Sequence, residues 1–179
     1  MSPLVRLAQA VEGADALDAV VGVVRPLAEA LVGDARRRDL LQGRWLGHAL
    51  HPLMTDLPIG FWTSATVLDL VGGEASRPAA ELLTVLGVAS TVPTAVTGWA
   101  EFAGLGTDRD RRTASVHAIG NGLAIWCYAG SWAARRRGRW TTGVALGLAG
   151  ASVASVAGFL GGHLSEGRKV SSRHPAFQD

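Results

Sequence analysis

The stretch TTGVALGLAGASVASVAGFLGGHL, residues 141–164, decides the fold class that this sequence predicts. It contains no aspartate, glutamate, lysine or arginine, and it exceeds the roughly 20 residues that an α-helix needs to cross the hydrocarbon layer of a membrane. A helix satisfies its own backbone hydrogen bonds, so such a stretch is stable in lipid. Residues 141–164 are therefore predicted to form a transmembrane helix.

Three further apolar segments precede this one, separated by short polar loops, at residues 52–72, 82–100 and 113–134. The first of them carries Asp56 and Asp69, whereas the other two carry no acidic residue, lysine or arginine. Four segments of membrane-spanning length predict an all-α integral membrane protein built as a four-helix bundle. A soluble bundle is the alternative, but it would need a polar face on each helix, which the last two segments lack.

Small residues fill the predicted membrane helices, as in GLAGASVASVAG at residues 147–158. Glycine, alanine, serine and threonine let helix backbones approach closely within a membrane. The predicted bundle occupies residues 45–165. It is preceded by an N-terminal region at residues 1–44 and followed by a polar C-terminal tail at residues 166–179.

The N-terminal region is predicted to be helical and amphipathic. Leucines and valines recur at helical spacing through residues 17–31, with acidic residues and arginines between them, and Pro26 should kink or divide this helix. Such a helix packs either on a protein core or in the interface of a bilayer. We favour the interface, with Arg36, Arg37 and Arg38 near the lipid headgroups.

Composition excludes several classes of protein. The formal net charge of +2 is too small for nucleic-acid binding. Cys127 is the only cysteine, which excludes intrachain disulfides, thiolate zinc sites, protein-ligated iron-sulfur clusters and attachment of a c-type haem. The N-terminus does not read as a secretory signal, so the protein's own helices are expected to bring it to the lipid bilayer.

The distribution of basic residues predicts an orientation. With four crossings, the N-terminal region, the loop TDRDRR and the C-terminal tail share one side, and this side carries more arginine and lysine near the crossings than the other. The positive-inside rule therefore places both termini in the cytoplasm. The compact segment RRRGR between the third and fourth crossings argues for the opposite orientation.

Four of the five histidines are placed to meet at one membrane face. His48 and His51 precede the first crossing, His117 lies near the start of the third, and His163 lies near the end of the fourth. In an up-down-up-down bundle these positions share one layer. Ionisable residues in spanning segments are costly and are retained for function, so we predict that these histidines bind a b-type haem or a Zn or Fe ion. Pro52 suits the first helical position, which would make His51 the N-cap.

Other polar residues are predicted for the same layer. Asp56 and Glu101 are candidate oxygen ligands for an ion. Asp56 and Asn121 are candidates for hydrogen-bonding a ligating imidazole and fixing its tautomer; Asn121 follows His117 by about one helical turn. Asp69 is instead expected to pair with an arginine at the opposite membrane face.

Three functional classes fit these residues. A haem held between imidazoles of different helices would pass electrons between a membrane quinone and a soluble partner. Direct chelation of Zn or non-haem Fe would leave an open position that could activate water. In the third class the protein binds no cofactor and is a membrane scaffold or assembly subunit. The residues do not decide whether the protein is an enzyme, and they are compatible with a homo-oligomer.

The segments that carry the histidines resemble a known family. LLQGRWLGHALHPLMTDLPIGFWTSATVLDLVGG, VHAIGNGLAIWCYAGSW and GFLGGHLSEGRKV are similar to the bacterial four-helix membrane proteins grouped as domain of unknown function 2231. Within these segments, His117, Asn121 and His163 match the family's pattern.

The resemblance implies a location and a role. Members of this family occur alone or joined to Rieske or cytochrome c domains, which implies a multi-pass protein of the bacterial cytoplasmic (inner) membrane with a part in electron transfer. The sequence stops after SEGRKVSSRHPAFQD. A Rieske or cytochrome redox partner is therefore expected to be a separate protein.

Overall fold

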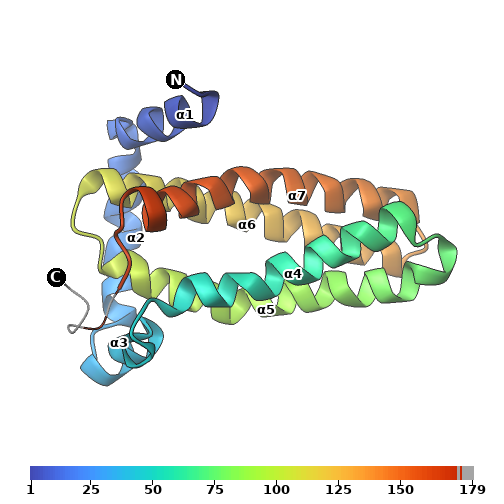
Figure 1. Cartoon of the computed structure of the whole chain (residues 1–179), viewed down its shortest axis with the longest axis horizontal. Coiled ribbons are helices and arrows are strands. Elements are labelled where there is room, and N and C mark those ends of the chain that lie inside the picture. Colours follow the sequence, from blue (N-terminus) through green and yellow to red (C-terminus); the bar gives the residue numbers. More distant parts are fainter. Residues whose placement is uncertain (173, 175–179) are drawn as a thin grey trace. The chain divides into compact units, whose positions relative to one another are not determined.

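The part of the chain that the structure describes, residues 1–172 and 174, is all-helical in the computed structural model and contains no β-strand (Figure 1). This confirms the all-α prediction. Along the described residues, the α-helices are α1 (Pro3–Glu12), α2 (Asp18–Leu31), α3 (Ala35–Leu41), α4 (Leu50–Val71), α5 (Arg77–Ala103), α6 (Asp108–Arg136) and α7 (Trp140–Gly162). Short helical turns connect or extend them: η1 (Asp15–Leu17), η2 (Arg44–Leu46), η3 (Glu74–Ser76) and the π-helical turn η4 (His163–Gly167).

Two compact units make up the chain. The first comprises Met1–Leu53, Ala95–Ile119 and Ala157–Asp179, and the second comprises Met54–Thr94 and Gly120–Val156. The first unit therefore contains α1, α2 and α3 together with one end of each long helix. The second unit contains the remaining parts of α4, α5, α6 and α7.

The N-terminal helices begin at side chains that cap their open N–H groups. Ser2 Oγ accepts a hydrogen bond from the backbone nitrogen of Val5 at 3.3 Å, and Asp34 Oδ1 accepts one from Arg37 at 2.9 Å. α2 continues through Pro26, so the alternative in which this proline divides the helix is wrong. The carbonyl that Pro26 leaves without its helical donor belongs to a turn that is exposed, where solvent can satisfy it.

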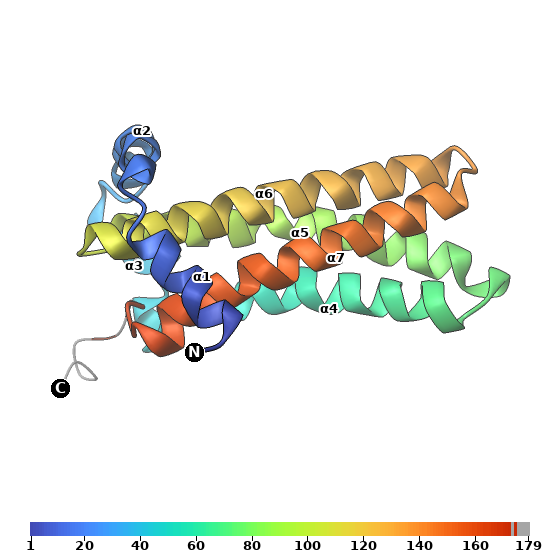
Figure 2. The ribbon, with the colours of Figure 1, turned by 90° about the horizontal axis from the view of Figure 1, so that it is seen from above.

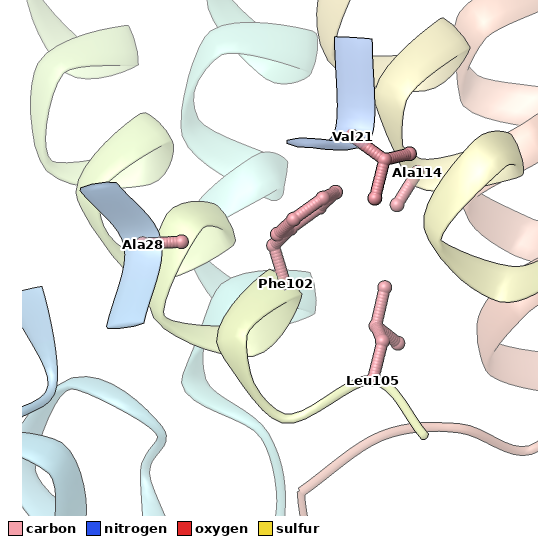
Figure 3. Close-up of a cluster of buried hydrophobic side chains, with 5 residues drawn as sticks. All are labelled: Val21, Ala28, Phe102, Leu105 and Ala114. Carbon is pink, nitrogen blue, oxygen red and sulfur yellow. The ribbon is translucent and has the colours of Figure 1, made fainter. Parts of the chain in front are cut away.

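A hydrophobic core holds α2 against the ends of α5 and α6 (Figure 3). Val21 and Ala28 of α2 are buried with Phe102 of α5, Ala114 of α6 and Leu105 between those two helices. Figures 1 and 2 show α2 lying crosswise to α5 and α6 in this unit. One face of α2 therefore packs on protein.

The opposite face of α2 is apolar and uncovered. Val23 and Leu27 are 71% and 70% exposed. This pattern leaves a surface that could meet lipid, and the predicted position of residues 1–44 in the bilayer interface stays a prediction.

All four segments predicted to cross the membrane are helical. They lie within α4, apart from Gly72 at the end of the first segment, and within α5, α6 and the continuous segment formed by α7 and η4. α4 begins at Leu50, so His51 lies inside its first turn, and the prediction that His51 caps this helix is wrong. Pro52 is still in the first turn, where its missing N–H would have no intrahelical acceptor.

Two helical segments among the described residues are long and apolar enough to cross a membrane. These are Glu74–Ala103 and Trp140–Gly167, which contain the second and fourth predicted crossings. α4 and α6 do not meet the same criterion. The four-crossing bundle therefore stays a prediction.

Hydrogen bonds and ring stacking join the helices of the second unit. Pro58 leaves the carbonyl of Met54 without its helical donor, and the hydroxyl of Thr94 on α5 donates to this oxygen at 3.0 Å. Trp62 of α4 stacks on Tyr128 of α6, with ring centres 3.9 Å apart and ring planes at 8°. α4 thus contacts both α5 and α6 in this unit.

The described part of the predicted tail lies against the first unit. Arg168 donates to Asp110 at 2.8 Å, and the backbone nitrogen of Ser172 donates to Glu101 at 2.9 Å. Residues 173 and 175–179, which belong to the same predicted tail, lie outside the described residues.

Candidate functional site

Two of the four candidate histidines lie close together in the first unit. His51 is in the first turn of α4 and His117 is on α6. The centres of their rings are 6.2 Å apart, and the ring planes are nearly perpendicular, at 87°. Folding thus brings imidazoles from two different helices into one site.

The tautomer of His117 follows from its hydrogen bond to α7. Its Nδ1 lies 2.7 Å from the backbone oxygen of Ala157. A carbonyl oxygen can only accept, so Nδ1 must carry the proton and donate. In the neutral ring this leaves the lone pair on Nε2, which is the arrangement that metal-ligating histidines commonly have.

The ring of His51 is positioned by α5. Its Nδ1 lies 3.4 Å from the hydroxyl oxygen of Thr97, which is 4% exposed. Both imidazoles are therefore contacted through Nδ1 by a neighbouring helix, α5 for His51 and α7 for His117.

Each imidazole also packs against a glycine. A Cβ atom added at Gly98 of α5 would lie 2.9 Å from Cε1 of His51, and one added at Gly161 of α7 would lie 2.7 Å from Cε1 of His117. Such distances are too short for real Cβ contacts, so a larger residue at either position would have to displace the imidazole. The two glycines thus create the space that the histidine rings occupy.

The other two candidate histidines have different surroundings. His163 Nε2 lies 2.8 Å from Oε1 of Glu12 on α1. Arg168 lies 3.9 Å from the same carboxylate oxygen. His48 is exposed, and its Nδ1 lies 3.1 Å from the backbone oxygen of Ala49.

The polar residues predicted for the same layer are also dispersed. Asp56 is exposed on α4, and Asn121 is half-buried on α6, one turn beyond His117. Glu101 accepts the hydrogen bond from Ser172 through Oε2, while its buried Oε1 has no hydrogen-bond partner among the described residues. Glu101 therefore holds the start of the C-terminal segment.

The donor set does not fit chelation of a metal ion by the protein alone. Within residues 1–172 and 174, no three or more histidine, cysteine, aspartate or glutamate side chains come together in a group that could hold a metal ion. A structural zinc site needs four protein ligands and a catalytic one usually needs three. His48, His163, Asp56 and Glu101 do not complete such a set around His51 and His117.

The same donor set fits a group that needs only two protein ligands. An imidazole nitrogen lies about 2 Å from the metal it binds, with the ring centre about 1 Å further away, so two imidazoles on opposite sides of one ion have ring centres about 6 Å apart. The ring centres of His51 and His117 are 6.2 Å apart. A b-type haem needs only two imidazole ligands, so His51 and His117 would be the residues to hold one.

Sequence reasoning missed the residues that position this pair. Thr97, Gly98, Ala157 and Gly161 each contact one of the two imidazoles. One sequence signal could have found two of them. Ala157 and Gly161 are four residues apart and lie on one helix face, and small residues at this spacing are typical of close contacts between helices. Nothing in the local sequence pointed to Glu12 as the partner of His163.

Comparison with known protein families matches residues 47–174 to one family, described as predicted membrane protein (DUF2231). The chain belongs to this family. The matched range contains all four candidate histidines and all of α4, α5, α6 and α7. Neither the curated proteins nor the solved structures gave a match.

Proposed function

We propose that this DUF2231 protein is a multi-pass protein of the bacterial cytoplasmic membrane, in which α4, α5, α6 and α7 form a four-helix transmembrane bundle. Membership of a family of predicted membrane proteins and the two candidate spans support this proposal. Both termini would face the cytoplasm, as the positive-inside rule predicts.

The distribution of side chains on the long helices is the main support for four crossings. Exposed positions carry large apolar residues, including Leu57, Ile59, Leu70, Val92, Leu123, Trp126 and Val156. Buried positions carry small polar residues, including Thr84, Thr91, Thr94, Thr97, Ser115 and Ser131. Large apolar side chains stabilise a surface in lipid rather than in water, and small polar residues are typical of contacts between membrane helices.

We further propose that His51 and His117 would together hold one b-type haem. The observation that carries this proposal is the 6.2 Å separation of their ring centres. The hydrogen bond from His117 Nδ1 to Ala157 supports it, because it fixes the orientation of the ring and places the proton of the neutral ring on Nδ1. A haem iron bound in this way exchanges single electrons.

Electron transfer is the function that this site supports best. His51 and His117 would hold the group that supplies one-electron redox chemistry, and the proposed partners are a membrane quinone and a separate Rieske or cytochrome protein. The protein's own part is to hold two imidazoles at a fixed separation, since Gly98 and Gly161 leave the rings room and Thr97 and Ala157 contact their Nδ1 atoms.

The proposal is tested by the absorption spectrum of the protein, purified from membranes under conditions that keep its helices folded. We expect a Soret band that sharpens and shifts on reduction, and we expect it to be lost in His51→Ala and in His117→Ala. His48→Ala is the matched control, because His48 lies three residues from His51 on the same segment but is exposed, and this variant should retain the band.

Each alternative has its own result in the same experiment. A colourless protein with stoichiometric Zn or Fe would support direct chelation by a wider ligand set that includes His48, His163, Asp56 or Glu101. A colourless protein without metal, unchanged in thermal stability by His117→Ala, would support a scaffold or assembly role. Either result would overturn the haem proposal.

A further inference from the structure

The exposed face of α2, in the first unit, is apolar from one end of the helix to the other. Each residue of an α-helix is rotated by about 100° from the one before it, which fixes the side on which each residue lies. Five exposed apolar residues share an arc of roughly 100° on the side away from the core. They are Ala19, Val23, Pro26, Leu27 and Ala30.

The charged residues of α2 lie on one flank, between the buried face and the exposed apolar face. They share an arc of roughly 40°, and they are Asp18, Arg25 and Glu29. The opposite flank is apolar and half-buried, and it consists of Val20, Val24 and Leu31. α2 is therefore polar along one flank and apolar along the other.

The charged flank lies beside the polar beginning of α6. Nε of Arg112 donates to Oδ1 of Asp18 at 2.6 Å, and Arg25 interacts with the charge of Asp108, the first residue of α6. Both α6 residues come directly before the third predicted crossing at residues 113–134. The charged flank of α2 thus lies at the level of α6 where the chain changes from polar to apolar, on the polar side of that boundary.

The direction of α2 agrees with a position along this boundary. Figures 1 and 2 show α2 lying crosswise to α5 and α6. A helix crosswise to a membrane-spanning helix runs along the plane of the membrane. Helices that lie in a bilayer interface combine a charged side with an apolar side in this way.

The surroundings of the exposed face favour lipid acyl chains as its partner. Its two largest residues, Val23 and Leu27, are 71% and 70% exposed, and such a surface is unfavourable in water. In the same unit, α6 also exposes an apolar side chain, Ile119, within its predicted crossing. Glu29 is paired with Arg25 at 2.6 Å, so the neighbouring flank presents balanced charges.

We propose that α2 lies in the plane of the membrane interface, with its exposed apolar face against the acyl chains of one lipid leaflet. This inference rests on the proposed crossing of the membrane by α6. The helix covers α5 and α6 with its buried face, binds lipid with its exposed apolar face, and directs its charged flank toward the water. The N-terminal region is then part of the membrane domain.

Spin labels on the full-length protein in lipid nanodiscs test this position. Cys127→Ser removes the single native cysteine, and Val23→Cys or Leu27→Cys then carries one nitroxide label on the exposed apolar face. Molecular oxygen concentrates in hydrocarbon, whereas a charge-neutral nickel chelate stays in water. We expect oxygen to collide several-fold more often than the nickel chelate with both labels.

Glu29→Cys is the matched control, because it places the label on the charged flank of the same helix. The ion pair that it removes is half-exposed, so its loss should have little effect on stability. At this position we expect the nickel chelate to collide more often than oxygen. Melting temperatures within a few degrees of the wild type verify that the labelled variants are folded.

Two results would overturn the proposal. More frequent collisions with the nickel chelate at Val23 and Leu27 would show that this face meets water. Immobilised labels that neither reagent reaches would show that another protein, or a second copy of this chain, covers it.

A label at Trp126→Cys separates this inference from the proposed bundle. Trp126 is on α6 and is 77% exposed, so in a membrane-spanning helix its label should be reached mainly by oxygen. Oxygen access at Trp126 together with water access at Val23 and Leu27 would overturn the position of α2 alone. Water access at all three positions would overturn the crossing by α6, and the inference about α2 with it.

Discussion

Arg135 and Asp69 form a bidentate ion pair that is almost fully buried in the second unit. NH1 of Arg135 lies 2.7 Å from Oδ1 of Asp69 and NH2 lies 2.6 Å from Oδ2, while the two side chains are 1% and 5% exposed. Nε of Arg135 donates to Ser131, and its guanidinium lies 4.5 Å from the ring centre of Trp140. The pair links α4 to α6, and it confirms the prediction that Asp69 pairs with an arginine.

Removing one partner of this pair should be strongly destabilising. Asp69→Asn leaves the Arg135 charge buried without a counter-charge, and we expect the free energy of unfolding to fall by about 3–5 kcal/mol. Denaturant unfolding in detergent micelles measures this. The double variant Asp69→Leu with Arg135→Met removes both charges and should lose less stability than the single variant, whereas an equal or larger loss would contradict this account.

The glycines beside the two imidazoles should control the content of haem. Gly161→Ala places a Cβ 2.7 Å from Cε1 of His117, so the ring must move and the ligand pair is disturbed. We expect the haem content per protein to fall. Gly158→Ala, on the same helix but with nothing within 4 Å of the added Cβ, is the matched control and should keep its haem. Equal haem content in the two variants would show that the space at Gly161 does not matter.

Among the aromatic residues of the second unit, Trp62 should contribute most to the free energy of unfolding. It stacks on Tyr128, and its indole nitrogen donates to the carbonyl of Thr84 at 3.3 Å. Trp62→Ala should lower the free energy of unfolding by about 3–5 kcal/mol. Trp126→Ala, a change at a residue that is 77% exposed, should alter it by less than about 0.5 kcal/mol. Similar losses at both positions would argue against this packing.

The ion pair between α2 and α6 should make stability depend on pH. Nε of Arg112 lies 2.6 Å from Oδ1 of Asp18, and NH2 lies 2.7 Å from Oδ2. The hydrogen bonds from Arg112 lower the pKa of Asp18 below its ordinary value of 3.8. A carboxyl whose pKa is lowered in the folded protein adds stability above its unfolded pKa, and this contribution is lost as the pH falls through the folded pKa.

Thermal unfolding of the wild type and of Asp18→Asn tests this dependence. The wild type should have the higher melting temperature at about pH 6, and the difference should shrink as the pH falls below the unfolded value of about 3.8 and through the lower pKa of the native carboxyl. A difference that stays constant over this range would show that Asp18 does not act through its charge.

The sequence predicted the long helices well because their signal is local. Apolar stretches of about membrane-spanning length must satisfy their own backbone hydrogen bonds in lipid, and the segments at 82–100, 113–134 and 141–164 are helical throughout, as are residues 52–71 of the first segment. The sequence predicted the ends of these helices less accurately, since helix capping depends on the hydrogen bonds of a few atoms. α4 begins at Leu50 rather than after His51, and α2 continues through Pro26 because its exposed turn tolerates the lost hydrogen bond.

The candidate site depends on contacts that the local sequence does not predict. The sequence selected His48, His51, His117 and His163 by their depth along the helices, but depth does not fix the direction in which a side chain points. The structure brings together His51 and His117, whereas His163 pairs with Glu12 from a distant part of the chain.

The sequence by itself determined that the chain is helical, that two of its helical segments are long and apolar enough to cross a membrane, and that its single cysteine cannot form a thiolate cluster. These properties depend on composition and on spacing within one segment. Only the tertiary structure decided which imidazoles meet, because that depends on the rotation of α4 and α6 about their axes and on the room left by Gly98 and Gly161. Contacts between distant segments determine both the rotation of these helices and the space for the rings, and no local sequence pattern predicts such contacts.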